Sequence, residues 1–248
     1  MEANQHHRRT FEGLLKEVDW TLERLEWRIC DTFREVSWKD TDVLEIGCGR
    51  GDFGLYMALN GARTVTAVDP AGAGGGESKT AVLKKRLSVL SPSNFSFLPI
   101  RIEDFCVDSN SFDLAFGIQA VEHIHETRLP LEKDTNAWLH YKKTFEHIQR
   151  ILRPGGALIL TDVSRWSFWS LLRKVAGRRL LSPFTPFVYW EIHQRPATWF
   201  RLLRDSGFAR VRLTWRVPYP MRMVPIVADN VIFQYFTLAS FTLSAFKR

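Results

Sequence analysis

The sequence lacks the features that would place it in a membrane or in an oxidising compartment. Its 248 residues include three cysteines, and no two of them are spaced as CxxC. Such a sparse, odd-numbered set predicts a reducing environment without a disulfide framework. No uninterrupted apolar run reaches the roughly 18 residues of a membrane span. The first residues also contain no apolar run suited to a signal peptide, so we expect a cytoplasmic protein.

The composition is that of an ordinary globular chain. Hydrophobic residues make up 45% of the sequence and charged residues 25%, and this length is sufficient for one large domain with a substantial core. The formal net charge of +7 permits a nucleic-acid or anionic membrane partner but does not require one.

Apolar segments alternate between the periods of strands and helices. Spacings of three and four over residues 8–35 predict one long amphipathic helix. The expected strands cover residues 42–47, 64–69, 94–100, 111–118, 157–163, 209–215 and a stretch within 231–246. The expected helices between them cover residues 52–61, 78–90, 138–152 and 197–208. This alternation predicts a doubly wound α/β sheet with right-handed crossovers.

We expect a single domain over residues 1–248. Residues 1–40 form an N-terminal helical extension, and 41–163 form a cofactor-binding core. Residues 164–195 are an insertion after the fifth strand, and 196–248 complete the core. A glycine-rich stretch at 71–76 is expected to be a loop after the second strand.

The stretch LEIGCGRGDFG, residues 44–54, is a glycine turn between a strand and a helix. It is not a phosphate-binding P-loop, because no Gly-Lys-Ser/Thr follows. Gly49 to Gly54 match the dinucleotide pattern GxGxxG, but counting from Gly47 the pattern is GxGxG. The carboxylate of Glu45, two residues earlier, would repel a pyrophosphate, whereas it would bind the ammonium group of a ligand favourably.

Four motifs in order extend this reading: VLEIGCGRG, VDP at the end of the second strand, SFDLAF before EHI, and LRPGG before the fifth strand. With these motifs the sequence resembles the class I S-adenosylmethionine-dependent methyltransferases, in particular the branch that includes the ubiquinone- and menaquinone-biosynthesis enzymes. The resemblance implies a Rossmann-like seven-stranded sheet whose last strand is antiparallel. It also implies S-adenosylmethionine as the cofactor.

The resemblance implies a role for each motif residue. Glycines at 47 and 49 let the backbone pass beneath the methionine part, and Glu45 orients the ammonium group. Asp69 accepts the ribose hydroxyls; the alternative is a helix N-cap. After strand three, Arg101 stands where the family often has an acid, so the adenine contact passes to Glu103 or Asp104. The full set of expected cofactor residues is Glu45, Gly47, Cys48, Gly49, Asp69, Pro70, Ile102, Glu103, Asp104 and Gln119.

The segment after strand four is expected to hold the reacting centre. The resemblance places the Glu-His pair there, and His123 is the candidate general base. The alternative is that His123 packs as a neutral side chain while water carries the proton. Some relatives bind a divalent metal through ExxEH, but Gln119 occupies the first position here, so we assign no metal.

The insertion is basic and aromatic, with no acidic residue from 163 to 190. Three interpretations stay open: a lid over an apolar substrate pocket, a membrane-interface contact through 165–190, and a nucleic-acid surface. We expect methyl transfer to an oxygen or carbon of an apolar or aromatic small molecule. The alternatives are an RNA methyltransferase that uses the basic surface and a non-catalytic scaffold that binds the cofactor.

Overall fold

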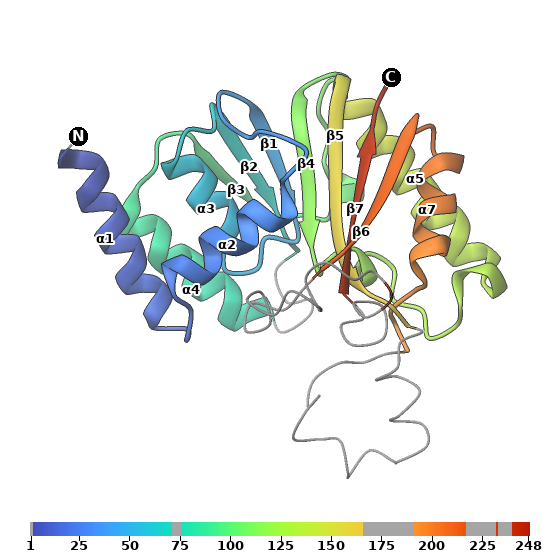
Figure 1. Cartoon of the computed structure of the whole chain (residues 1–248), viewed down its shortest axis with the longest axis horizontal. Helices are drawn as coiled ribbons and strands as arrows, with labels where there is room; N and C mark the ends of the chain where they lie inside the picture. The colour runs from blue at the N-terminus through green and yellow to red at the C-terminus, as the bar shows by residue number, and fades with distance from the viewer. Residues whose placement is uncertain (1, 71–75, 166–190, 217–231, 233–239) are drawn as a thin grey trace, which may run out of the picture.

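The fold is built on one seven-stranded sheet. The computed structural model describes residues 2–70, 76–165, 191–216, 232 and 240–248 (Figure 1). The strand order is β3-β2-β1-β4-β5-β7-β6. The strands are β1 (Asp42–Ile46), β2 (Thr64–Val68), β3 (Phe95–Leu98), β4 (Phe112–Ile118), β5 (Leu152–Val163), β6 (Arg210–Trp215) and β7 (Ser240–Phe246). The five strands β1 to β5 pair in parallel, and β7 runs antiparallel to both β5 and β6. This confirms the predicted doubly wound sheet and its antiparallel last strand.

Helices cover both faces of the sheet, as Figure 1 shows, with α1 to α4 on one side and α5 and α7 on the other. The longer helices are α1 (Glu2–Lys16), α2 (Leu22–Thr32), α3 (Asp52–Leu59), α4 (Gly76–Leu90), α5 (Thr135–Ile151) and α7 (Pro196–Asp205). The described segments also contain the short 3-10 helices η1 (Ile102–Asp104), η2 (Val121–His123) and η3 (Leu131–Lys133). Each face therefore has its own hydrophobic core.

The N-terminal extension is helical, but the prediction of one helix over 8–35 is wrong. The chain breaks into α1 and α2 around Asp19, whose φ is +57°. Thr21 caps α2, because its hydroxyl accepts the Arg24 N–H at 3.2 Å. Both helices bury apolar residues such as Leu15 and Leu25 in the same core. The helical spacing of apolar residues therefore continues from α1 into α2. In the sequence, the break between the two helices is indicated only by the capping residue of α2.

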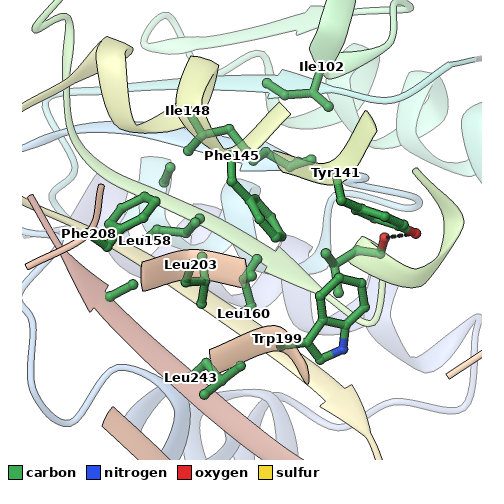
Figure 2. Close-up of a cluster of buried hydrophobic side chains, with 14 of the residues drawn as sticks. Ile102, Tyr141, Phe145, Ile148, Leu158, Leu160, Trp199, Leu203, Phe208 and Leu243 are labelled. Carbon is green, nitrogen blue, oxygen red and sulfur yellow. Dashed lines mark hydrogen bonds between the residues drawn. The ribbon is translucent and has the colours of Figure 1, made fainter. Parts of the chain in front are cut away.

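The core beneath α5 and α7 holds the loop after β4 in place (Figure 2). Tyr141 and Trp199 pack edge to face with ring centroids 5.0 Å apart. The Tyr141 hydroxyl donates to the Val121 carbonyl at 3.0 Å, and the Trp199 indole N–H donates to Asp162 Oδ2 at 2.7 Å. Two buried aromatic side chains thus anchor polar groups at the carboxyl ends of β4 and β5.

Several predicted segments lie partly or wholly outside the described residues. These are most of the 164–195 insertion, most of the 71–76 loop and the part of the last strand before Ser240. Where the chain enters and leaves the insertion it is paired, since the Arg165 N–H donates to the Gln194 carbonyl at 3.2 Å. Within the described part of the chain, no helix has both the length and the apolar character to cross a membrane.

An ion-pair cluster joins the strands at the amino edge of the sheet, opposite the glycine turn. Arg63 donates to both Asp42 oxygens at 2.9 and 2.6 Å. Arg153 donates to Asp42 at 2.8 Å and to Asp113 at 2.6 Å. These hydrogen bonds, chiefly those from Arg63, hold the pKa of Asp42 well below its usual range. The cluster therefore stabilises the folded state wherever the unfolded Asp42 would be ionised.

We predict that Asp42→Asn lowers the free energy of unfolding at pH 7 by about 1.5–3 kcal/mol, the range for hydrogen bonds to charged groups. Because the folded-state pKa is depressed, this stabilisation is present above about pH 4 and is lost as pH falls. Urea unfolding at pH 7, 5 and 3.5 would measure it. Asp205→Asn is the control, because the one ion pair of that carboxylate with a described residue is an exposed contact with Arg201 at 3.7 Å. An equal loss at every pH would contradict an ionic origin.

Candidate active site

A cavity of about 400 Å³ opens where the carboxyl ends of β1, β2 and β4 meet. The strand order reverses here, because the chain continues from β1 to β2 on one side and later returns to place β4 on the other. Open α/β sheets bind their ligands at such a switch point. The cavity also has the volume typical of small-molecule sites.

The glycine turn forms the floor of this cavity and requires glycine for two reasons. Gly47 has φ +69°, and a Cβ on it would lie 2.5 Å from the Cβ of Ala120. Gly51, with φ +71°, would place a Cβ 2.6 Å from Leu83 Cδ1. Side chains at these positions would be strained by the backbone and would collide with their neighbours. The turn can therefore lie flat against the loop that follows β4.

Glu45 is a buried carboxylate behind the turn. Its side chain lines the cavity, and its Oε2 accepts the Gly54 N–H at 3.2 Å. Burial, with smaller contributions from Asp52 and Asp69, raises the pKa of Glu45 well above its usual value. A Cβ at Gly54 would overlap the Glu45 carboxylate. The close contact with Glu45 is thus sufficient to explain why position 54 is glycine, and no pyrophosphate-binding role is needed.

Asp69 follows β2 and faces the glycine turn. Its Oδ2 accepts the Gly49 N–H at 2.7 Å, while Oδ1 makes no hydrogen bond to the described residues. Burial raises the pKa of Asp69, opposed by the Gly49 hydrogen bond and by Lys79. This carboxylate therefore joins β2 to the turn through one oxygen and keeps acceptor capacity on the other.

Nine of the ten cofactor residues expected from the sequence line the cavity, and Asp104 does not. Ile102 and Glu103 from η1 lie on its wall beside Arg101, and Gln119 lies beyond the end of β4 with φ +50°. Glu103 is also 2.9 Å from His140 Nε2. The nine lining residues are Glu45, Gly47, Cys48, Gly49, Asp69, Pro70, Ile102, Glu103 and Gln119.

The sequence reasoning missed the wall formed by the N-terminal helices. Trp20 and Arg28 line the cavity, although they stand far from any motif. Among the described residues, four cationic side chains line it: Arg28, Arg50, Lys79 and Arg101. No spacing rule connects α2 to the glycine turn, so only the packing of α2 against α3 brings these residues to the site.

His123 lines the cavity from the loop after β4. Its Nδ1 is 2.7 Å from Glu126 Oε1, and its side chain is 38% exposed. If Nδ1 carries the proton that Glu126 accepts, Nε2 keeps its lone pair. Nε2 is 4.0 Å from Glu122 Oε1. His123 therefore lies at the cavity wall with Nδ1 against Glu126 and Nε2 near the buried Glu122.

A second polar cluster, Glu122, Asp162 and His193, is buried under the same loop. Within the described part of the chain, these three could together hold a metal ion, with ligand atoms within 4.8 Å of one another. However, His193 Nδ1 is 2.6 Å from Asp162 Oδ1, and Asp162 also accepts from Trp199 and from the Val163 N–H. The hydrogen bonds of Asp162 are satisfied inside the protein, so we assign no metal to this cluster.

Glu122 differs from its partners in this cluster. It is 3% exposed, and its Oε2 has no hydrogen-bond partner among the described residues. Burial, followed by the nearby Asp162, raises the pKa of Glu122 well above its usual value. No sequence pattern indicates the cluster, because Asp162 and His193 are 31 residues apart and meet only through the fold.

Comparisons with known proteins agree with this geometry. A family model described as a methyltransferase domain matches residues 6–213. The chain is 27% identical over 217 residues to a tRNA U34 carboxymethyltransferase of Methylococcus capsulatus, covering 84% of this chain and 49% of that protein. It is 29% identical over 173 residues to a malonyl-[acyl-carrier protein] O-methyltransferase of Paenibacillus, covering 68% of this chain and 55% of that protein. The chain thus spans about half the length of these curated relatives.

A solved structure shares the fold. It is that of Haemonchus contortus phospholethanolamine N-methyltransferase 2 in complex with phosphomonomethylethanolamine and S-adenosylhomocysteine. The TM-score is 0.60 at 16% identity, covering 92% of this chain and 53% of that one. The family match spans most of the chain, and it covers the glycine turn, Asp69 and the loop after β4. The chain therefore belongs to the methyltransferase-domain family, within the class I S-adenosylmethionine-dependent methyltransferases.

Proposed function

We propose that this chain transfers a methyl group from S-adenosylmethionine to an oxygen or carbon of an apolar or aromatic small molecule. The observation that carries the proposal is the meeting of Glu45, Asp69 and a glycine floor at one edge of the sheet. When bound, the cofactor supplies a methyl carbon that is already a strong electrophile. The protein's main task is then to position an acceptor against it, which can contribute about 7–11 kcal/mol.

The residues present fit this cofactor. The glycine turn leaves room for a ligand backbone where side chains would collide, and Asp69 has one oxygen without a hydrogen bond to the described residues. Glu45 offers a carboxylate for an ammonium group, and pairing with a cation would offset the burial that raises its pKa. Ile102 and Glu103 supply an apolar side chain and a carboxylate on the wall expected to meet the adenine.

His123 is the proposed general base. His123 Nε2 would accept the proton that a hydroxyl or carbon acceptor gives up on methylation, while the bound cofactor would supply the methyl group and leave as the neutral thioether S-adenosylhomocysteine. Glu126, through its contact with Nδ1, orients the ring and stabilises the imidazolium that forms. If water carries the proton instead, His123 has a packing role only.

The acceptor class has a second candidate. One relative modifies tRNA by its name, and four cationic side chains line the cavity. An RNA acceptor would use these and the net charge of +7. A third candidate is a scaffold that binds the cofactor without turnover. The 165–190 segment, with its basic and aromatic composition, is proposed as a lid over an apolar acceptor, with a peripheral membrane contact if that acceptor is a lipid.

We predict that Asp69→Ala weakens binding of S-adenosylhomocysteine by about 10- to 100-fold, because the hydroxyls lose a charged acceptor. Isothermal titration calorimetry on both proteins would measure this. Asp104→Ala is the matched control, since that residue is exposed and outside the cavity wall, and its affinity should equal the wild type. NADH is the competing ligand; if it binds while S-adenosylhomocysteine does not, the proposed cofactor is wrong.

A transfer assay would distinguish the acceptor classes. With S-adenosylmethionine labelled in its methyl group, we expect label to enter quinols, phenols or fatty acids, and to stay out of total RNA. Label in RNA, with binding that weakens steeply as salt rises, would support the RNA alternative. If the cofactor binds but label enters none of the acceptors, the result would support the non-catalytic scaffold.

With an acceptor from that screen, we predict that His123→Gln lowers kcat by about 10²- to 10⁴-fold, the usual contribution of a general base. S-adenosylhomocysteine affinity should not change. Glu126→Gln should lower kcat less, since it removes the orienting partner and leaves the base. Full activity of His123→Gln would assign the proton transfer to water.

A further inference from the structure

Arg28 is a cationic side chain in the cavity wall that has no anionic partner among the described residues. It lies on α2 and lines the cavity with Trp20 and Phe53. Its guanidinium carbon is 5.4 Å from the centre of the Trp20 ring and 5.7 Å from that of Phe53. No described carboxylate comes within 4.0 Å of it, although such pairs are frequent elsewhere in the chain. Its described partners are therefore aromatic faces, which stabilise a cation only weakly.

The two carboxylates whose negative charges act on Arg28 are already paired with other arginines. Asp31 and Asp52 are the acidic groups that act on Arg28, and each has both oxygens in contact with another guanidinium. Asp31 pairs with Arg34 and with Arg216, and Asp52 pairs with Arg50 and with Arg86. Positive charge is thus in excess at this wall.

This excess affects Arg28 itself. Burial, followed by repulsion from Arg216 and Arg24, lowers the pKa of Arg28 to about 10. The guanidinium therefore still carries its charge at neutral pH. A largely desolvated cation without a counter-ion is unfavourable. Because Arg28 lines the cavity, a ligand bound there could supply the counter-ion.

We propose that Arg28 binds a carboxylate of a ligand in the cavity, with Trp20 and Phe53 holding the guanidinium in place. A guanidinium suits this task because its planar fork can donate two parallel hydrogen bonds to one carboxylate. The proposal rests on the proposed function, because it assumes that the ligand enters this cavity. The proposal gives α2 a role in recognising the carboxylate of a ligand, which no motif in the sequence indicates.

Two carboxylates could occupy this position: that of the cofactor's methionine half, or one on the methyl acceptor. Both have the same chemistry. In either case Glu45 and Arg28, both in the cavity wall, provide groups of opposite charge. A ligand with an ammonium and a carboxylate would find a partner for each.

The first experiment is calorimetric titration of wild type, Arg28→Met and Arg28→Lys with S-adenosylhomocysteine and with its decarboxylated analogue. Arg24→Met is the matched control, because Arg24 lies on the same helix, 5.2 Å from the Trp20 ring, but is not part of the cavity wall. If Arg28 binds the cofactor carboxylate, Arg28→Met should weaken S-adenosylhomocysteine by about 10- to 100-fold. It should leave the decarboxylated analogue unchanged. Arg28→Lys should be intermediate, and Arg24→Met should resemble the wild type.

The second experiment tests the acceptor as the source. Benzoate is titrated into each variant. Variants that bind S-adenosylhomocysteine are first saturated with that compound, and variants that do not bind it are titrated with benzoate alone. Benzoate binding that is lost in Arg28→Met but kept in Arg24→Met would place an acceptor carboxylate on Arg28. If Arg28→Met changes neither titration while its thermal unfolding stays cooperative, the proposal is overturned. Failure of wild type to bind S-adenosylhomocysteine would refute the cofactor instead, and the benzoate titration would still decide the role of Arg28.

Discussion

The site depends on the close approach of two loops at the carboxyl edge of the sheet. Gly47 after β1 and Ala120 after β4 come so near that a Cβ on Gly47 would lie 2.5 Å from that of Ala120. This contact is possible only because β1 and β4 are adjacent parallel strands that end at the same edge. The switch in strand order opens the cavity, and the missing side chain lets the turn form its floor.

Charged groups around the turn hold it in position. Arg86 is 1% exposed and pairs with Asp52 at the start of α3. It also donates to the Arg50 carbonyl at 2.9 Å and to the Leu14 carbonyl at 3.3 Å. One guanidinium therefore ties α4 to the turn, to α3 and to α1. Burying it is costly unless such partners are present, so the N-terminal extension is part of the support of the site.

The fold was largely predictable from the sequence, because apolar strands and amphipathic helices have distinct periods. The exception was the break at Asp19, since both α1 and α2 bury the same kind of face. Residues in the cavity wall were predictable where a motif named them. Arg28 and the Glu122–Asp162–His193 cluster were not, because they come from segments that are distant in the chain and carry no common pattern.

The sequence by itself determined which segments form β1 to β5, the glycine turn, and the acidic residues at the carboxyl ends of β1 and β2. These features are local, since each follows from a few consecutive residues and the geometry of the peptide. Only the tertiary structure decided which side chains share the cavity. It left Asp104 outside, placed Arg28 inside and brought Asp162 to His193, because burial and charge pairing depend on elements that the chain joins only through packing.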